Sequence, residues 1–544
     1  MSNFDDAPRY DAATEAEFRE QGYWTDDTLE TVLAKWSSSE PGRVAIIHGP
    51  ARITFGELHA ASRRVANGLL DLGLRKGNVV AIQMPNLPEF LIAYLGVALM
   101  GGVLCPLHMP YRASEMTPLL AHAGARAIIC GEPTGSYDCR AEMRRVKDMV
   151  PGLEFIIGLG RSDDPDIVSF DTLAAAADAP IADPPTAADW VIINFTSGTS
   201  SAPKAILRHY EPYMANTRIS PATVDLTSDD VMMSAPPFSH GFGLYTSTMA
   251  LYVGAANLML PQYSPEAFAR TIAEGGATLV WGAPAHLVAA LKAGHFEKHD
   301  FSSVRDIELG GSVCPPDVAR AAEQLLPNGR IGQIFGLTEG MLTMQTRLDA
   351  PAAIRHSSTG IANQGVELRI TGGDGRVLEA GAEGELEMRG YSVTPGYLRN
   401  ESANATSFGP DGWYRTGDLA IIDDGGNVYI TGRDRDIINR GSIKINPTDV
   451  ESILARHPAI VLAAIVPMPD EALGERGCLF ATLLPGETLD LAAVTAFLAD
   501  NDVAKLQWPE HLVVVEDMPM TPTKKIIKSE LQKMVGEVRF SARA

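Results

Sequence analysis

Apolar and polar positions in the first third of the chain alternate between the helical and the strand period. Residues 55–73 carry apolar side chains at helical spacing, residues 79–84 form a short apolar run, and residues 89–99 return to the helical spacing. Residues 127–130 and 155–158 fit two further buried strands. Because strands that alternate with helices build mainly parallel sheets, this part of the sequence predicts an α/β fold.

The pattern changes from residue 365 onward. Segments such as VELRITGGDGRVL and GELEMRG read as short strands joined by glycine turns, which predicts a β-rich, more antiparallel subdomain. A charged run, GRDRD, then precedes an amphipathic helix at 447–456 and a strand at 462–466. We therefore predict a large N-terminal domain of α/β layers with a β-rich subdomain (1–432), a hinge (433–435) and a small, mobile α+β domain (436–544).

Composition narrows the choice of partners. The 544 residues include 45 Lys and Arg against 67 Asp and Glu, a formal charge of −22, which disfavours nucleic acid and anionic membranes as partners. Five cysteines without a CxxC pair argue against a disulfide framework. The acidic N-terminus has no signal-peptide pattern, and the apolar stretch 90–107 is interrupted by glycines and a proline, so we expect a cytoplasmic protein.

One loop carries the strongest local signal for chemistry. In WVIINFTSGTSSAPKAILRHY (190–210), an apolar strand runs into a loop rich in hydroxyls and glycine, followed by Lys204 and a second apolar run. Such a loop offers backbone N–H groups, hydroxyls and one ammonium to phosphate oxygens. The GxxxxGK[ST] spacing of a P-loop is absent. Taken alone, the segment is explained as well by an ordinary Ser/Thr-rich turn.

Four further segments follow this loop in order: IFGLTEG (334–340), WYRTGDLA (413–420), GRDRDIINRGSIKI (432–445) and MPMTPTKKIIKSEL (518–531). Together the five resemble the motifs of the adenylate-forming superfamily, which includes acyl-CoA synthetases, aryl-acid ligases, peptide-synthetase adenylation domains and luciferases. RITFGEL (52–58) fits the early helix of that superfamily. The resemblance spans almost the whole chain. It implies an enzyme that activates a carboxylic acid as its acyl-adenylate with ATP and Mg²⁺.

The resemblance also implies a nucleotide site. The phosphates would meet Thr196, Ser197, Gly198, Thr199 and Lys204 of the loop, and the adenine would lie along Gly310, Gly311 and Ser312. Phe335 and Gly336 would belong to the same nucleotide site. Thr338 would bind the α-phosphate, and Glu339 would hold Mg²⁺ with help from Thr196, because Mg²⁺ prefers hard oxygen ligands. Asp418 and Arg433 would hold the ribose. Ordinary turn residues and an interdomain ion pair are the plain alternatives for these positions.

Lys525 matches the catalytic lysine of the superfamily. When a carboxylate attacks the α-phosphate, negative charge builds on the phosphoryl oxygens, and an ammonium placed there stabilises the transition state. A solvated tail lysine is the plain alternative. In the superfamily the small domain swings about one residue, which here is Arg435, and this replaces the lysine by a face that lines the tunnel for CoA. Gly441 and Ser442 stand at that tunnel.

The chain departs from the superfamily pattern at four positions where glycine is expected: Ser201, Ala205, Ser442 and Lys524. Glycine allows close approach of a ligand to the backbone and a positive φ. Ser442 bears on function, since a side chain there narrows the tunnel for the thiol.

The resemblance places the acid beside His240, Gly241, Phe242, Trp281, Gly282, Gly340 and Met341. His240 is expected to act as the gate before the acid carboxylate, with a structural histidine as the plain alternative. The segment 234–247 has no Asp or Glu to pair with an amino group, and Gly241 replaces the Asn of salicylate-type ligases. A mostly apolar pocket suits an uncharged body with a carboxylate at one end.

REQGYWTDDTLE and the RHP segment (456–458) resemble the branch with cyclohexanecarboxylate–CoA and dihydroxybenzoate ligases. We expect an acid–CoA ligase for a cyclohexanecarboxylate-like, aromatic or medium-chain acid, with ATP, Mg²⁺ and CoA. A carrier-protein phosphopantetheine is the alternative acceptor. A nucleotide-binding protein without catalysis and a light-emitting oxygenase on the same fold are more distant alternatives. The oligomeric state, a homodimer among the options, stays open.

Overall fold

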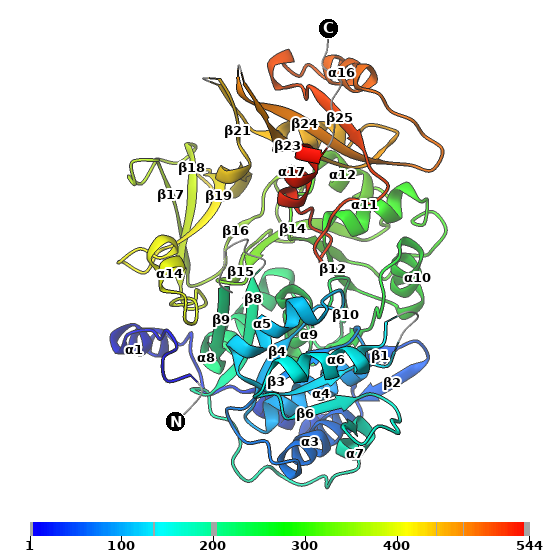
Figure 1. Ribbon diagram of the computed structural model, residues 1–544, viewed down its shortest axis with the longest axis vertical. Coiled ribbons are helices and arrows are strands. Elements are labelled where there is room, and N and C mark those ends of the chain that lie inside the picture. The colour runs from blue at the N-terminus through cyan, green and yellow to red at the C-terminus, as the bar shows by residue number, and fades with distance from the viewer. Residues whose placement is uncertain (1–3, 134–136, 197–203, 442, 472, 538–544) are drawn as a thin grey trace.

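The computed structural model describes residues 4–133, 137–196, 204–441, 443–471 and 473–537. The chain forms a large N-terminal part of several sheets and helices, with a smaller C-terminal domain against it (Figure 1). This arrangement confirms the α/β fold class. The positions predicted at Ser197, Gly198, Thr199, Ser201 and Ser442 lie outside the described residues.

A seven-stranded sheet forms one layer of the N-terminal part, in the order β7-β6-β5-β3-β4-β8-β9. All neighbours are parallel except the last pair, in which β8 and β9 run antiparallel on either side of the predicted phosphate loop. The strands are β3 (Val79–Gln83), β4 (Val103–Pro106), β5 (Ala125–Cys130), β6 (Phe155–Gly158), β7 (Ile167–Ser169), β8 (Trp190–Thr196) and β9 (Lys204–His209).

A nine-stranded sheet forms the second layer, in the order β16-β15-β14-β13-β12-β10-β11-β1-β2. Its middle is parallel, and β14 turns back into the antiparallel strand β15 at the IFGLTEG segment. The strands are β1 (Val44–His48), β2 (Ala51–Thr54), β10 (Val231–Ser234), β11 (Ala256–Leu258), β12 (Leu279–Gly282), β13 (Asp306–Leu309), β14 (Arg330–Leu337), β15 (Met341–Gln345) and β16 (Ile361–Ala362).

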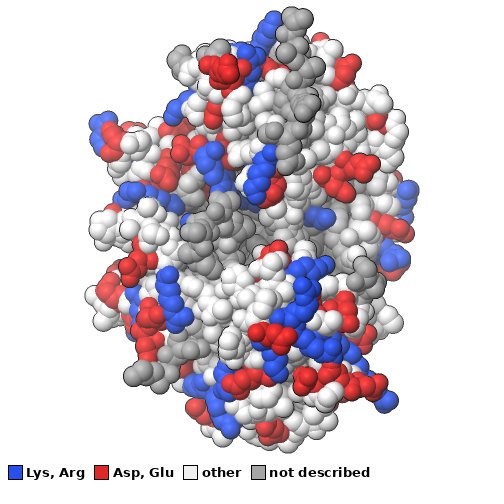
Figure 2. Space-filling model, viewed as in Figure 1, with Lys and Arg blue, Asp and Glu red and all other residues white. Residues whose placement is uncertain are grey.

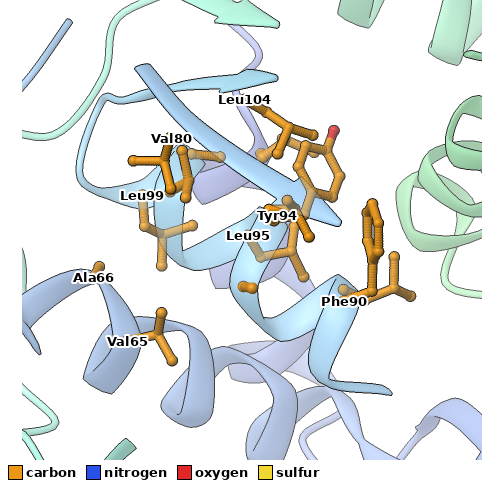
Figure 3. Close-up of a cluster of buried hydrophobic side chains, with 14 of the residues drawn as sticks. Val65, Ala66, Val80, Phe90, Tyr94, Leu95, Leu99 and Leu104 are labelled. Atoms are coloured by element: carbon orange, nitrogen blue, oxygen red, sulfur yellow. The ribbon is translucent and has the colours of Figure 1, made fainter. Parts of the chain in front are cut away.

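The main core includes side chains from both sheets and from helices α3 (Phe55–Asp71) and α4 (Pro88–Leu99). Figure 3 shows Phe90, Tyr94, Leu95 and Leu99 of α4 among these side chains. A helix that is apolar on all sides is stable only when it is enclosed, which accounts for the apolar stretch seen in the sequence. Gly96 lets α4 approach α3 closely, because a Cβ there would lie 2.6 Å from Val65 Cγ1.

Other helices cover the outer faces and the N-terminal region. Helices α5 (Ala113–Ala123) and α6 (Cys139–Met149) pack on the seven-stranded sheet, and α10 (Pro265–Gly275), α11 (Pro284–Lys292) and α12 (Pro316–Glu323) pack on the nine-stranded sheet. The remaining helices of this part are α1 (Ala12–Glu20), α2 (Leu29–Ser39), α7 (Phe170–Ala174), α8 (Tyr210–Ile219), η1 (Ser220–Val224), α9 (Gly241–Val253) and α13 (Ala352–Ser357).

The predicted β-rich subdomain is an antiparallel sheet of β17 (Val366–Thr371), β18 (Glu383–Gly390), β19 (Tyr414–Ile422) and β20 (Val428–Arg433), with α14 (Glu401–Ser407) beside it. A single 3-10 turn, η2 (Asp434–Asp436), leads from β20 into the last sheet. The C-terminal elements are β21 (Ile438–Arg440), β22 (Ile443–Ile445), α15 (Pro447–Leu454), β23 (Ile460–Asp470), β24 (Gly474–Leu483), α16 (Leu491–Asp500), η3 (Lys505–Gln507), β25 (His511–Val514) and α17 (Lys528–Glu537).

Charged groups of both signs are mixed over the face drawn in Figure 2, which is hollowed about halfway along its length. All five cysteines are buried and free. Within the described ranges, every helix is too short or too polar to cross a lipid bilayer.

Candidate active site

The turn between β14 and β15 presents Thr338 and Glu339 and is held from below by a buried arginine. Arg208 of β9 donates through Nη2 to the carbonyl oxygens of Thr338 (2.6 Å) and Glu339 (2.8 Å), and through Nη1 to that of Ser392 (2.8 Å). Burial lowers the pKa of this guanidinium. The three hydrogen bonds tie the turn to both the seven-stranded sheet and the β-rich subdomain, so the side chains of Thr338 and Glu339 start from a fixed backbone.

Glu339 is buried, and its carboxylate has a tyrosine partner that the sequence did not reveal. The Tyr397 hydroxyl donates to Glu339 Oε1 over 2.6 Å, and burial together with this carboxylate raises the pKa of Tyr397. Lys204 Nζ lies 5.1 Å from the centre of the Tyr397 ring. Thr196 is the cross-strand neighbour of Lys204 at the open end of the β8–β9 pair. The structure therefore brings Lys204 and Glu339 to Tyr397, with Thr196 beside Lys204 on the neighbouring strand.

These oxygens suit a magnesium ion. Within the described residues no group of three or more His, Cys, Asp and Glu side chains forms a self-contained metal site. Mg²⁺ in nucleotide enzymes is usually held by one or two protein oxygen ligands, with phosphate oxygens and water completing its shell. The buried carboxylate of Glu339 and the hydroxyl of Thr196 meet that requirement.

Asp418 and Arg433 face each other across strands β19 and β20. They are register partners, and Arg433 Nε donates to Asp418 Oδ1 over 2.7 Å. Asp418 is 4% exposed, and its backbone N–H donates to the Thr416 hydroxyl. The ion pair joins two strands of one sheet and is not the interdomain bridge considered as an alternative. A buried carboxylate fixed in this way can accept hydrogen bonds from a vicinal diol such as ribose.

The predicted adenine strip follows the ends of β13 and β14. Gly310 is buried at the end of β13, where a Cβ would lie 2.7 Å from Ile334 Cγ1. Gly311 has φ +86° and is exposed like Ser312 and Gly336, while Phe335 is half-buried. The strip is thus an open edge of bare backbone, as a flat base requires.

Lys525 lies in a tight turn just ahead of α17, closed by a bridge between Met520 and Ile526. Thr521 N–H donates to the carbonyl of Lys525 (2.7 Å), and Lys525 N–H donates to the Thr521 hydroxyl (3.1 Å). Burial and the neighbouring Arg433 and Arg435 lower the pKa of the Lys525 ammonium to about 8, against the opposing field of Asp418 and Asp436. The charges of Arg433 and Asp418 therefore both act on this ammonium.

Lys524, one of the four departures from glycine, has φ +63°, the left-handed region in which a side chain is strained. Its Nζ lies 5.9 Å from the ring centre of Tyr263, and its charge helps to lower the pKa of the buried His286. Lys524 thus turns toward the N-terminal domain beside α10 and α11, away from Asp418.

Further contacts hold the C-terminal domain in this orientation. The Lys292 ammonium at the end of α11 donates to the carbonyl of Ile460 in β23, and Arg456 Nη1 lies 3.2 Å from Asp317 Oδ2. Burial lowers the pKa of Lys292. The described contacts hold the C-terminal domain against the N-terminal part, with Lys525 influenced by residues predicted to bind the nucleotide.

His240 caps the N-terminus of α9, where its Nδ1 accepts the N–H of Phe242 over 3.1 Å. Nε2 therefore carries the proton of the neutral ring. Burial, with His108 and Lys525 nearby, lowers the pKa of His240 to about 3. The His108 ring is stacked at 6.0 Å and 16°, its Nδ1 bonds to Ser239, and its pKa is lowered to about 4. The sequence offered no signal for His108, which lies 132 positions before its partner (240 − 108).

The predicted acid pocket is a cluster shared by α9 and the nine-stranded sheet. Phe242, Trp281 and Met341 belong to one apolar cluster, with the Phe242 and Trp281 rings 6.0 Å apart at 49°. A Cβ at Gly241 would meet nothing within 4 Å, one at Gly282 would make ordinary contacts, and one at Gly340 would crowd Thr343 and Met388.

The predicted hinge and tunnel residues lie outside the apolar cluster of the predicted acid pocket. Arg435 is exposed in η2, with Nε 3.8 Å from Asp436 Oδ1. Gly441 is exposed, with φ +64°, in the turn between β21 and β22.

Comparisons with known proteins show the family of the chain. The family model "AMP-binding enzyme" matches residues 33–398, and "AMP-binding enzyme C-terminal domain" matches residues 449–525. A salicylyl-CoA synthase / salicylate adenylyltransferase from Streptomyces sp is 32% identical, over 95% of each chain. A salicyl-AMP ligase / salicyl-S-ArCP synthetase from Mycobacterium tuberculosis is also 32% identical, over 96% of this chain and 93% of its own. The crystal structure of the anthranilate CoA ligase AuaEII with anthranoyl-AMP superposes with a TM-score of 0.87 at 22% identity, covering 94% of this chain and 98% of its own.

Proposed function

We propose that this chain, which belongs to the AMP-binding enzyme family and is an adenylate-forming acid ligase, joins a carboxylic acid to coenzyme A. The acid carries no charge apart from its carboxylate. The observation that carries the proposal is a buried ammonium of the C-terminal domain, Lys525, which is influenced by the charges of Asp418 and Arg433 and in turn lowers the pKa of His240. An ammonium that interacts with both the predicted ribose ligand Asp418 and the predicted acid-pocket residue His240 is suited to the attack of a carboxylate on a nucleotide phosphate.

In the first half-reaction, a carboxylate oxygen of the acid attacks the α-phosphorus of ATP. A new P–O bond forms, the bond from the α-phosphorus to the bridging oxygen breaks, and pyrophosphate leaves with the electron pair. Lys525 holds its proton and offsets the charge on the α-phosphoryl oxygens, while Lys204 and Thr338 bind phosphate oxygens. Mg²⁺, held by Glu339 and Thr196, would neutralise phosphate charge when bound.

Neutral His240 suits the acid end of the site. With a pKa of about 3 the ring stays uncharged at physiological pH, so it does not form an ion pair that would hold the substrate carboxylate back. Its Nε2–H is a donor that can orient one carboxylate oxygen toward the phosphorus. The lining by Phe242, Trp281 and Met341 supports a cyclohexanecarboxylate-like, aromatic or medium-chain acid.

In the second half-reaction, the sulfur of CoA attacks the acyl carbonyl, the C–O bond to phosphate breaks, AMP leaves, and the thiol proton passes to solvent or a base. We propose that the C-terminal domain turns about Arg435 between the two steps and brings Gly441 and Ser442 to the thiol path. The exposure of Arg435, in a three-residue turn between two sheets, supports a hinge at this point.

A carrier-protein phosphopantetheine arm is the second candidate acceptor. The salicyl-AMP ligase / salicyl-S-ArCP synthetase is as similar to this chain as the CoA synthase is. Ser442 in place of glycine favours an acceptor other than free CoA if its side chain narrows the path.

The test is pyrophosphate release with Mg·ATP across cyclic, aromatic and straight-chain acids, each with and without CoA. Turnover that requires CoA supports the ligase. One equivalent of pyrophosphate per enzyme, unchanged by CoA, means that the adenylate stays bound and directs the search to a carrier protein. A Ser442→Gly variant that gains turnover with CoA would show that Ser442 excludes free CoA in the native enzyme. Absence of release with every acid would contradict the proposed reaction.

A further inference from the structure

Four buried polar side chains on the nine-stranded sheet lack the partners that buried groups normally have. Asp306 and Glu308 of β13, Gln345 of β15 and Trp281 of β12 are all 0% exposed. Among the described residues, the Gln345 amide and the Trp281 Nε1–H have no hydrogen-bond partner. The carboxyls of Asp306 and Glu308 contact each other and have no other partner there. Most buried polar groups are hydrogen-bonded, and leaving one unbonded is destabilising.

The strand register places these groups on one face of the sheet. Trp281 and Glu308 are direct neighbours on β12 and β13, and Glu308 is the neighbour of Gly332 on β14. Ile334, two residues after Gly332, is the neighbour of Gln345. Since side chains alternate between faces along a strand, Trp281, Glu308 and Gln345 project to the same side, and so does Asp306.

Gly332 lies in the middle of this group and lets the Glu308 carboxyl lie against the backbone. A Cβ at Gly332 would collide with Glu308 Oε1, so the carboxyl occupies the space above the bare backbone. Glycine inside a strand marks a place where another group approaches the backbone closely, and at Gly332 that group is the Glu308 carboxyl.

The face that carries these groups is the face toward the proposed acid pocket. Trp281 and Ile334 pack with Tyr245 of α9 and with the half-buried Phe242 and Met341. The intervening residues Ile307 and Ile331 point to the opposite side, among the helices α10–α12. The polar group is therefore the floor beneath an otherwise apolar lining.

The two carboxyls do not form a pair of anions. Burial raises the pKa of Asp306 to about 7, and burial together with Asp306 raises that of Glu308 well above its ordinary value. Arg305, Arg330 and Arg355 act in the opposite direction on Asp306, but Arg305 is bonded to Asp230 and Arg355 to Glu323. Both shifts favour the neutral carboxyl forms, so the floor offers hydrogen bonds and repels a second carboxylate less than two anions would.

We propose that the acid taken by this enzyme carries a hydroxyl group at the end away from its carboxylate, and that Trp281, Glu308 and Asp306 bind this hydroxyl. The Trp281 N–H donates to the hydroxyl oxygen, and the hydroxyl donates to the carboxyl pair. A hydroxyl does both, whereas a methoxy group cannot donate and an ammonium cannot accept. The inference rests on the proposed function and names its substrate class.

The test compares acids that differ at one position. Ring acids with a hydroxyl, hydrogen, methoxy or ammonium group at each ring position are assayed for pyrophosphate release, and their binding is measured by calorimetry. A site built to bond a hydroxyl discriminates strongly against its absence. We expect kcat/KM for the best hydroxy acid to exceed that for its deoxy analogue by at least about tenfold.

Variants separate the floor from the rest of the pocket. Glu308→Leu and Trp281→Phe should each reduce the preference for hydroxyl over hydrogen to about threefold or less, while Glu308→Gln, which keeps a donor and an acceptor, should retain more of it. Glu367→Leu is the matched control. Glu367 is an exposed strand glutamate of β17 bound to Arg389, and its replacement should leave the preference unchanged.

Equal rates and equal binding of hydroxy and deoxy acids by the native enzyme would overturn the inference, and would mean that water fills the floor. If the hydroxy and deoxy acids behave equally but both give rapid pyrophosphate release, the proposed ligase activity is still supported. Should no acid release pyrophosphate, the ligase proposal fails, and the calorimetric preference still decides the floor. If Glu308→Leu is misfolded by circular dichroism, Trp281→Phe carries the decision.

Discussion

The titration of Lys525 gives the sharpest test of the proposed chemistry. Its ammonium acts only when protonated, and its pKa in the folded protein is lowered to about 8. The protonated fraction is then about 91% at pH 7 and about 9% at pH 9, a tenfold loss. A lysine with the ordinary pKa of 10.5 would remain about 97% protonated at pH 9. Activity should therefore fall on the alkaline side, as the group loses its proton.

The assay is pyrophosphate release at saturating acid, with kcat/KM for Mg·ATP measured from pH 6 to pH 10. This ratio reports the enzyme before ATP binds, so its alkaline limb should lie near pH 8. In kcat the limb should move to higher pH, because bound phosphates favour the charged ammonium. His240 and His108, with pKa values of about 3 and 4, should add no limb between pH 5 and pH 7.

Substitution gives the size of the effect. Lys525→Ala should slow adenylate formation by on the order of a hundredfold or more, the usual cost of removing a group aimed at developing charge. It should also abolish the limb near pH 8. Lys524→Ala is the matched control, because Lys524 faces Tyr263 and should leave both the rate and the limb in place. A kcat/KM profile that stays flat from pH 7 to pH 9, or a Lys525→Ala loss below about threefold, would refute the assignment.

Three further predictions concern the residues around Lys525. Lys524→Gly removes a side chain from φ +63° and should raise the free energy of unfolding by about 1 kcal/mol in urea titrations; a loss of stability would contradict the strain argument. Tyr397→Phe removes the hydrogen bond to Glu339 and should raise the Mg²⁺ concentration for half-maximal pyrophosphate release by about 10-fold, with an unchanged requirement arguing against Glu339 as a ligand. Asp418→Asn should weaken AMP binding in calorimetry by about 1.5–3 kcal/mol, the range for hydrogen bonds to a charged group. An AMP affinity equal to that of the native protein would show that Asp418 is not a ribose ligand and that Arg433 alone is enough to bind the ribose.

The sequence predicted those parts of the fold in which local pattern and final environment agree. Helix α4 is apolar on all sides and is followed by glycines, and two apolar strands, β8 and β9, stand on either side of the hydroxyl-rich loop, so both features could be recognised. The order of strands within each sheet could not be derived, because it depends on which distant segments pair. The same limit hid Arg208 and Tyr397, whose partners lie 130 or more and 58 residues away.

Strand β13 shows a second limit. Asp306 and Glu308 alternate with Ile307 and Leu309, a pattern typical of a strand with one face in water. In the structure all four residues are buried, because the second face is covered by the acid-pocket side of the molecule. An alternation of polar and apolar residues shows which residues share a face of a strand, but it does not show whether that face is exposed. The segments used to predict the pocket did not include β13, so the pocket was predicted to be mostly apolar.

The short turn at Arg435 has a consequence for how the chain meets a protease. Arg435 is exposed and stands between two sheets that share no strand, whereas the preceding Arg433 is held by Asp418. Trypsin should therefore cut first after Arg435 and release the C-terminal domain as a folded fragment, since that domain has its own apolar core around Ile438, Leu479 and Leu498. A ligand that locks Lys525 against the nucleotide site would slow this cut, and its rate would then report the position of the domain in solution without any measurement of catalysis.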